Sequence, residues 1–529
     1  MSRNITEVRL LAVPLENDYK HTLYFNSLSE QTSYFLSKTV KSGNDFSYQR
    51  KDKIIRYPAD YDELLGCNYV MYKNEAYSNK WYYAFITKLE YVNDGRTNIY
   101  IETDVIQTWL FDYYVRASFI EREHVDDDTV GLHTYPEGLE LGEYIINDVT
   151  SDTKLLPANA VVMGSTIEPT EMNVDVGGRY NGIYSGVKYY AYSLEGTEEV
   201  ADAGINVVGE IIQRITDKKG DGAISSLFLA PEFLIEGFEH GGPIENSEYA
   251  QTYEFSVDKK YGLDGHNVRN NKLKTYPYCY LLVSNGNGGC AEYRYEFFNT
   301  EKCAFTVRGA LTPGCSIRLI PGEYKNSISP ESEGLNLGKY PQCNWATDQY
   351  TNWLTQNGVN VATGIAMGGA LMMSAVNPVL AGTLASMTLV EGAVALSGFT
   401  QVASSLNEVK KASMIPPNTQ GNINCGDVVT AGNDNTFHYY NMSIRKEYAE
   451  IIDGFFDMFG YKVGKVKVPN RGHRENWWYT KTIDVSIDGD IPSEDMSKIK
   501  ACYNTGITFW RNPNIIGNYN GNGITNKII

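Results

Sequence analysis

The feature that most constrains this chain is a run of 42 consecutive residues without a charged side chain, between Asp348 and Glu391. An Asn-Pro pair at 377–378 divides the region into two arms, about 361–376 and 379–398. As helices that rise about 1.5 Å per residue, these arms would be about 24 and 30 Å long. Because the hydrocarbon core of a bilayer is about 30 Å thick, the lengths predict a helical hairpin of membrane-spanning size.

Small side chains dominate this apolar region. Of the 42 residues from Val359 to Thr400, 21 are Gly, Ala, Ser or Thr. Such residues let apolar helices approach closely in lipid, where van der Waals contact drives association. Gly364 and Gly368 stand at GxxxG spacing and are the predicted helix-packing residues. The predicted membrane-active residues are the large apolar side chains of both arms: Ile365, Met367, Leu371, Met372, Met373, Val379, Leu380, Leu384, Met387 and Leu389.

Three interpretations fit the apolar region. A helix that is apolar all round is either buried in a core or directed to a membrane, so a core hairpin is the first. An ordinary integral membrane protein is the second, but Glu391 in the second arm would cost a few kcal/mol at mid-bilayer. In the third, the segment is stored in a soluble assembly and released later into a membrane.

The rest of the chain is predicted to be mainly β with some α, an α+β fold. The 40 tyrosines favour half-buried, pleated surfaces. Aromatic and β-branched runs around Asn93-Asp94-Gly95 predict a β-hairpin, and the runs beside 285–289 predict a second. Apolar residues at helical spacing from Ile205 to Ile215 predict an amphipathic helix. We further expect strands within 454–470 and 476–487 and a loose tail at 517–529.

Composition limits the partners. The net charge is −18 without a polybasic run, so tight binding of DNA phosphates is not expected, although an acidic conduit would let DNA pass. The eight cysteines have no CxxC spacing and are predicted to be reduced thiols. No apolar run of signal-peptide length follows Met1, which predicts a protein made and kept in a cytoplasm.

No enzyme signature is present. HExxH, GxSxG, a Walker loop and GxGxxG are absent from the sequence, so we predict no catalytic residue, cofactor or metal site. The sequence from Asp484 to Asp495 begins like a calcium-binding loop but lacks Glu at the twelfth position. We therefore expect a strand that ends in an acidic turn. His and carboxylate residues gather between Arg122 and Tyr144, where Gly and Pro favour a long structured loop over a metal site.

Several long blocks follow one another in a specific order. On the N-terminal side they are VPLENDYKHTLYFNS from Val13, the block from Tyr91 to Trp109 and the block from Ala117 to Tyr144. The block from Tyr340 to Asn357 precedes the apolar region, and the C-terminal blocks are Phe459 to Thr482, Gly489 to Pro492 and Asn504 to Trp510. This series resembles the distal tail-tube, or tail-knob, proteins of small short-tailed picovirus-type phages.

The resemblance implies a virion protein, made in the host cytoplasm, that assembles as a homohexameric ring. It implies β-barrel tube domains around a DNA channel at the distal end of the tail, next to proteins of the proximal tail tube. A long hydrophobic loop, here residues 358–425, would plug the tube and be expelled as a pore in the host cytoplasmic membrane. Viral DNA would then pass through during genome ejection without tight binding.

The same resemblance sets the expected domain limits. They are residues 1–150 and 426–529 for the two parts of the tube domain, 151–338 for a middle or knob region, 339–357 for a connector and 358–425 for the membrane-active loop. Two other classes stay open from the sequence: a tail adhesin that binds host cell-wall glycan without membrane activity, and a cell-wall hydrolase.

Overall fold

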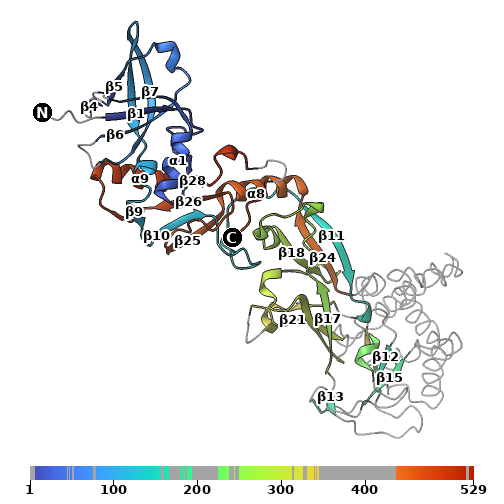
Figure 1. The fold of residues 1–529 in the computed structure, drawn as a ribbon. Coiled ribbons are helices and arrows are strands. Elements are labelled where there is room, and N and C mark those ends of the chain that lie inside the picture. The colour runs from blue at the N-terminus through green and yellow to red at the C-terminus, as the bar shows by residue number, and fades with distance from the viewer. Residues whose placement is uncertain are drawn as a thin grey trace, which may run out of the picture. The chain divides into compact units, whose positions relative to one another are not determined.

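The computed structural model describes residues 6–44, 53–74, 79–155, 250–286, 288–311, 315–325, 436–519 and 524–529, with shorter pieces between these ranges. The chain divides into two compact units. Unit 1 comprises Met1–Gly142, Gly265–Lys274 and Arg445–Ile529, and unit 2 comprises Glu143–Asp264 and Thr275–Ile444. Both units consist mainly of strands with a few helices (Figure 1), which confirms the expectation of a mainly β fold with some α structure.

The larger sheet of unit 1 has seven strands in the order β3-β1-β6-β7-β8-β5-β4. The predicted hairpin around Asn93-Asp94-Gly95 is confirmed, since its two strands pair antiparallel as β7 and β8. Gly95 has a φ of +75°, a conformation that favours glycine over other residues. The strands are β1 (Thr6–Leu11), β3 (Thr39–Gly43), β4 (Tyr48–Gln49), β5 (Ile54–Tyr57), β6 (Tyr69–Asn74), β7 (Tyr82–Asn93) and β8 (Arg96–Thr103).

A five-stranded sheet brings both ends of the chain into unit 1, in the order β2-β28-β26-β10-β25. Its strands are β2 (His21–Leu23), β10 (Ser118–Glu123), β25 (Tyr461–Lys467), β26 (Trp477–Ile483) and β28 (Ile507–Trp510). Trp477 and Trp510, on neighbouring strands, are buried with their ring centroids 5.0 Å apart. Both belong to one buried cluster with Phe25, Phe35 and Tyr69, so the N-terminal and C-terminal segments of the chain share one aromatic core. Strands β9 (Tyr113–Val115) and β27 (Ile487–Gly489) pair separately.

Four α-helices belong to the described part of unit 1: α1 (Leu28–Ser37), α2 (Val105–Trp109), α8 (Lys446–Phe459) and α9 (Ser493–Thr505). The strand expected from residue 454 is wrong at its start, because Gly454 to Phe459 is the last part of α8. Ala449, Ile452 and Phe456 are buried at helical spacing on this helix. The 3-10 turns of this unit are η1 (Tyr61–Leu64), η5 (Asn271–Lys274) and η9 (Pro513–Ile515).

The loose tail expected at 517–529 is wrong for the residues that the structure describes there. Asn526 Oδ1 accepts a hydrogen bond from Trp477 N at 3.1 Å, and Asn526 Nδ2 donates to Trp477 O at 2.8 Å. The ring of Tyr519 packs 5.0 Å from that of Trp510. These contacts attach the tail to the five-stranded sheet.

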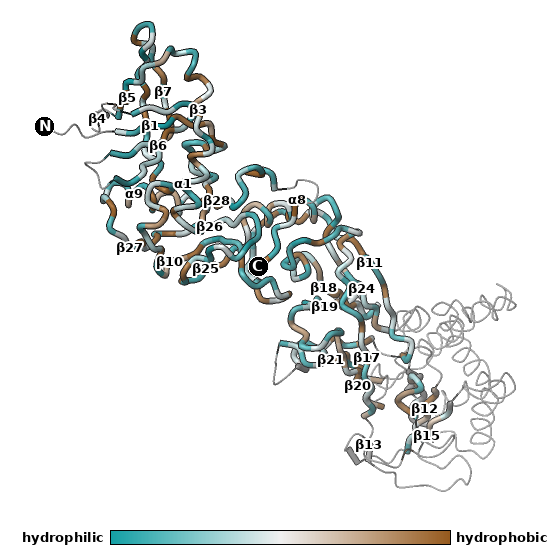
Figure 2. The backbone as a smooth tube through the Cα atoms, in the orientation of Figure 1, coloured by the Kyte–Doolittle hydropathy of each residue, from teal (hydrophilic) through white to brown (hydrophobic). Residues whose placement is uncertain are grey.

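Unit 2 has three four-stranded sheets and one two-stranded sheet among its described residues, in the orders β11-β24-β18-β19, β15-β12-β16-β23, β17-β20-β21-β22 and β13-β14. Buried and partly exposed residues alternate along strands such as β20, as expected for sheets with one wet face. Hydrophilic and hydrophobic residues are interspersed along the described strands (Figure 2). The strands are β11 (Tyr144–Ser151), β12 (Ala160–Ser165), β13 (Arg179–Tyr180), β14 (Ile183–Tyr184), β15 (Lys188–Ser193), β16 (Ile224–Ala230), β17 (Ala250–Asp258), β18 (Cys279–Ser284), β19 (Cys290–Tyr293), β20 (Lys302–Ala310), β21 (Ser316–Pro321), β22 (Leu335–Asn336), β23 (Gln342–Asn344) and β24 (His438–Ile444).

The second predicted hairpin is confirmed by β18 and β19, which pair antiparallel. Its second strand is shorter than expected, because Tyr295–Phe297 forms a 3-10 turn, η6. The other 3-10 turns of unit 2 are η2 (Thr153–Leu155), η3 (Glu232–Leu234), η4 (Leu263–Gly265) and η7 (Pro330–Glu333).

The expected β-barrel is not found among the described strands, which form open sheets. In the five-stranded sheet, β2 pairs only with β28 and β25 pairs only with β10, so the row does not close. The helix predicted from Ile205 to Ile215 lies outside the described residues. Of the helices that the structure describes, none combines the length and apolar character needed to cross a membrane.

Asp104 links α2 to the seven-stranded sheet and is completely buried. Its Oδ2 accepts from Tyr69 Oη at 2.8 Å, and its Oδ1 accepts from the backbone N–H groups of Ile106 and Gln107 at 3.1 and 3.0 Å. Burial raises the pKa of Asp104 to about 6, which these three hydrogen bonds only partly offset. The folded protein therefore binds this proton at a higher pH than the unfolded chain does, and the corresponding stability is lost as pH rises through about 6.

We predict that Asp104→Asn, which keeps an oxygen at the helix N-cap, removes this pH dependence. Between pH 4 and 7 the free energy of unfolding of the wild type should fall by up to about 3 kcal/mol relative to the variant. Denaturant unfolding at a series of pH values measures the difference, and Asp62→Asn, at an exposed position, controls for the loss of one carboxylate. Parallel pH profiles for wild type and Asp104→Asn would contradict the prediction.

Candidate functional site

The predicted membrane-active and helix-packing residues, from Gly364 to Leu389, all lie outside the described residues. What the structure describes is the place where the chain enters and leaves this region. We call this place the base and define it as residues 152–155, Tyr340, Gln342–Asn344 and Thr436–Ile444. All of these residues belong to unit 2.

Two strands of the base flank residues 345–435. The strand before them, β23, is an edge strand of a four-stranded sheet and pairs with β16. The strand after them, β24, lies inside another sheet, between β11 and β18. Because β24 pairs on both sides, the backbone of residues 438–444 is firmly held.

Asp152 holds the first described residues that follow the apolar region in the chain, Thr436 and Phe437. Its backbone N–H donates to Phe437 O at 3.1 Å, and its backbone carbonyl accepts from Thr436 Oγ1 at 2.6 Å. Its carboxylate accepts from Tyr253 Oη at 2.5 Å and from Lys154 N at 3.1 Å. Asp152, Thr436 and Phe437 are all fully buried, so these hydrogen bonds do not compete with water.

Tyr340 fixes the chain before the apolar region to the same short segment. Its Oη donates to Leu155 O at 3.2 Å, and both residues are buried. Residues 152–155 therefore hold the chain on both sides of residues 345–435. Tyr340 and Thr436, which lie 96 positions apart in the sequence, are thus held at one place in unit 2.

Burial raises the pKa of Asp152, and the hydrogen bonds from Tyr253 and Lys154 oppose this shift. A carboxyl whose pKa is higher in the folded state than in the unfolded chain stabilises the folded state more when it is protonated. The base is therefore expected to become more stable as pH falls through this raised pKa.

No pattern in the sequence pointed to the base. Asp152 and Thr436 are 284 residues apart, and Leu155 and Tyr340 are 185 apart. Residues 437–444 have a sequence typical of a strand, which is a weak signal, but nothing in it identifies the strands that pair with it.

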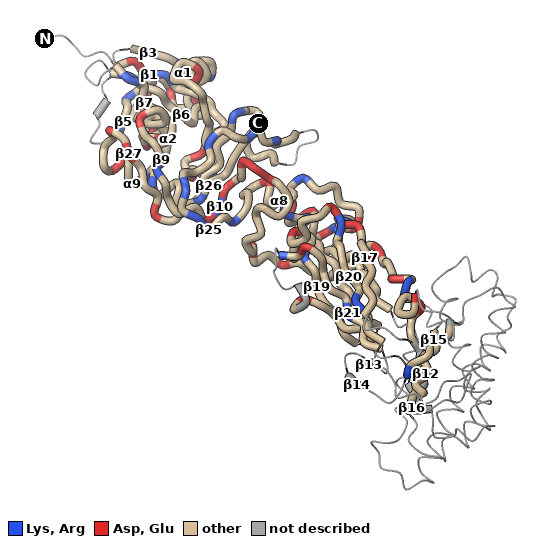
Figure 3. The backbone as a smooth tube through the Cα atoms, turned by 90° about the horizontal axis from the view of Figure 1, so that it is seen from below, with Lys and Arg blue, Asp and Glu red and all other residues tan. Residues whose placement is uncertain are grey.

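Charged residues of both signs are interspersed in the described parts of both units (Figure 3). In the predicted long loop from Arg122 to Tyr144, which is irregular between β10 and β11, Glu137 forms ion pairs with Arg122 and with Lys272. Burial lowers the pKa of His124 to about 3, so its neutral ring accepts from Tyr479 N at 2.8 Å.

The near-calcium loop directs its carboxylates to separate partners. Asp488 pairs with Arg116, and Asp495 accepts from Trp109 Nε1 at 3.0 Å. In the part of the chain that the structure describes, His, Cys, Asp and Glu residues form no group of three or more with the spacing of a metal site.

Comparison with known proteins gives two family matches. The family model for the C-terminal domain of tail knob protein gp9 from Bacillus phage phi29 matches residues 244–523, and that for the N-terminus of the caudoviral major tail protein matches residues 4–114. The first match covers more than half of the chain and includes the apolar region and every residue of the base except 152–155.

Individual proteins agree over nearly the whole chain. The chain is 25% identical to tail knob protein gp9 of Bacillus phage phi29, with 97% of this chain and 98% of that protein covered. It is 27% identical to gp9 of Bacillus phage PZA, with the same coverage, and 27% identical to gp9 of Bacillus phage B103, with 96% of both covered. The fold is similar to that of the bacteriophage C1 tail knob protein gp12, with a TM-score of 0.65 and 13% identity over 99% of this chain and 100% of that chain.

The base should depend on the hydroxyl of Thr436. We predict that Thr436→Val lowers the free energy of unfolding by about 1–3 kcal/mol, because it leaves the buried carbonyl of Asp152 without this donor. The matched control is Thr300→Val, which removes an exposed hydroxyl–carbonyl bond to Lys302 and should cost less than about 0.5 kcal/mol. Denaturant unfolding measures both, and equal effects would argue against a structural role for the base.

Proposed function

Because the chain belongs to the family of tail knob proteins represented by gp9 of Bacillus phage phi29, we propose that it forms the distal tail tube of a short-tailed phage as a homohexamer. A structural role in the virion tail is common to these relatives. The ring, its position at the distal end and its junction with the proximal tail tube are part of the proposal. So is its synthesis in the host cytoplasm.

In the proposed mechanism, residues 358–425 of each subunit plug the tube and are released to form a pore in the host cytoplasmic membrane. The observation that supports this most directly is the base, because residues 152–155 hold both ends of the region that carries the uncharged run. A segment held in this way can move out of a tube while the folded units stay assembled. Residues 339–357 serve as the connector in this proposal.

The energetics favour an exchange of one apolar environment for another. Inside the tube, the uncharged side chains would contact the same segment of neighbouring subunits, and in a bilayer they would contact lipid tails. Since lipid is as apolar as a protein core, the transfer costs little, and Gly364 and Gly368 would support helix contact in the membrane. Glu391 is the exception, at about 3 kcal/mol if it were placed at the bilayer centre.

The charge of the ring suits a conduit that does not retain DNA. Six copies at −18 each give a formal charge of −108. Such a ring gains nothing from counterion release on phosphates. Viral DNA in transit would therefore pass without tight binding.

Deletion of residues 358–425 tests the assignment of the loop. We expect the deletion variant to assemble like the wild type, because the base and both units are kept, but to release no dye from liposomes that the wild-type protein permeabilises. Sedimentation velocity and liposome leakage measure the two properties. Equal leakage from the deletion variant would show that another part of the chain acts on the membrane.

A double substitution tests the same segment with less disturbance. Gly364→Glu with Met372→Glu places two charges in the first arm, at a cost of at least about 5 kcal/mol per hairpin at mid-bilayer. We expect leakage to be lost, whereas the apolar control Gly364→Ala with Met372→Leu should retain it. Full leakage from the Glu variant would favour a hairpin that stays packed within the protein.

A further inference from the structure

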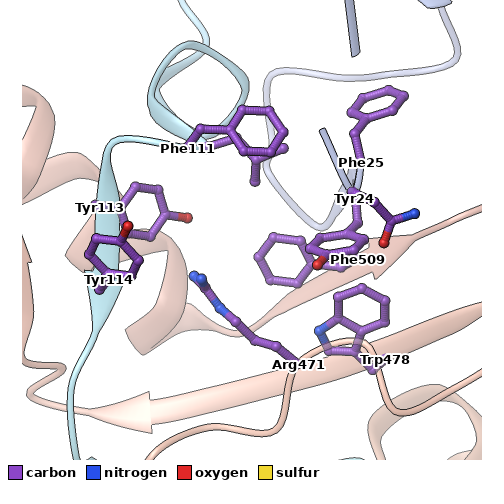
Figure 4. A pocket seen from close by; sticks show the side chains of 10 residues that line it. Tyr24, Phe25, Phe111, Tyr113, Tyr114, Arg471, Trp478 and Phe509 are labelled. Atoms are coloured by element: carbon purple, nitrogen blue, oxygen red, sulfur yellow. The ribbon is translucent and has the colours of Figure 1, made fainter. Parts of the chain in front are cut away.

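Unit 1 contains an aromatic pocket that none of the roles above uses (Figure 4). The pocket has a volume of about 210 Å³ and draws its walls from the segment after β2, from β9, β26 and β28, and from the segment after β25. Sites for drug-sized ligands begin at about 300 Å³, so this pocket suits a single ring-sized group. Its lining includes Tyr113, Tyr114, Arg471, Trp478 and Phe509.

Trp478 presents a hydrogen-bond donor without an acceptor. Its side chain is 2% exposed, and no atom of the described residues accepts a hydrogen bond from its Nε1. In Figure 4 the indole nitrogen lies at the edge of the ring that faces Arg471. A buried N–H left without a partner costs about 1–3 kcal/mol, so this donor is unusual in an interior and marks a place for an acceptor.

Arg471 adds a positive charge without a carboxylate partner. Its Nη2 donates to Tyr503 Oη at 2.8 Å, and its guanidinium lies 5.4 Å from the ring centre of Tyr113. Among the described residues, no Asp or Glu forms an ion pair with it. A guanidinium has five N–H donors, so most of those of Arg471 are available to a ligand.

A second guanidinium, that of Arg511, strengthens the positive character of the pocket. It lies 5.6 Å from the ring centre of Trp478, while its own N–H groups donate to the backbone carbonyls of Arg474 and Gly472. Arg511 therefore contributes charge but has fewer free donors than Arg471. The pocket therefore combines aromatic walls with the guanidinium of Arg471, which has free N–H donors, and with the unpaired indole N–H of Trp478.

We propose that this pocket binds a singly charged oxyanion, a carboxylate or a phosphodiester, attached to a ring-sized body. An oxyanion only accepts hydrogen bonds, so it would satisfy both Trp478 Nε1 and Arg471. Hydrogen bonds from a guanidinium to an oxyanion are among the stronger ones in proteins. The rings of Tyr113, Tyr114 and Phe509 would contact the body that carries the charge.

Calorimetric titration of the full-length protein tests the proposal with small probes. The anionic probes are 4-hydroxybenzoate and phenyl methyl phosphate, and the neutral isostere of the first is 4-hydroxybenzamide. We expect at least one anion to bind, and the amide to bind about tenfold more weakly or not at all. Whichever anion binds more tightly identifies the head group.

Variants then locate the binding. Arg471→Gln should weaken anion binding about tenfold or more, whereas Arg116→Gln, which changes an exposed arginine of the same unit, should leave it unchanged. Tyr114 is 72% exposed, so Tyr114→Ala should fold normally. This variant should weaken the binding of the anion and of its neutral isostere alike, because it removes a contact with the ring of the probe.

Three results would overturn the proposal. They are equal affinity for the acid and the amide, no effect of Arg471→Gln, and no binding of either anion. A change of oligomeric state in the Arg471→Gln protein without probe binding would identify the pocket as a subunit contact instead. None of these outcomes depends on membrane activity, so the proposal can fail while the proposed function stands.

Discussion

The hydrogen bonds that residues 152–155 make to both sides of the apolar region are the constraint on which this account depends. Asp152 holds Thr436 and Phe437, and Leu155 holds Tyr340, all in buried surroundings. Because both ends meet at one place in unit 2, we propose that the region between them is an inserted loop. The entropy of closing a loop grows only slowly with its length, so a few buried hydrogen bonds are enough to fix the ends of a very long one.

The sequence allowed prediction of the parts of the fold that depend on local signals. The hairpin of β7 and β8 follows from Asn93-Asp94-Gly95, because a tight turn needs residues that accept a positive φ. The last residues of α8 resemble a strand in the sequence because they are rich in aromatic side chains, although Ala449, Ile452 and Phe456 are buried at helical spacing. The attachment of the tail could not be predicted, since Asn526 bonds to Trp477 across 49 residues.

Only the chemical character of the candidate site could be predicted from the sequence. The absence of charge and the small side chains single out Gly364 to Leu389 without any knowledge of the fold. The base and the aromatic pocket are different, because each is assembled from segments far apart in the chain. Arg471 and Tyr113, for example, approach each other only because β9 and the segment after β25 meet in unit 1. Side chains that act through such contacts leave no periodic or spacing signal in a single sequence.

The central claim is that residues 358–425 enter the bilayer while the two folded units stay outside it. The most direct measurement is photolabelling of the wild-type protein with a carbene probe dissolved in liposome membranes, followed by peptide mapping. The account predicts label concentrated within residues 358–425 and little label on β1 to β11 or on β24 to β28. Label spread over the strands, with none in residues 358–425 of a protein that permeabilises the same liposomes, would contradict it.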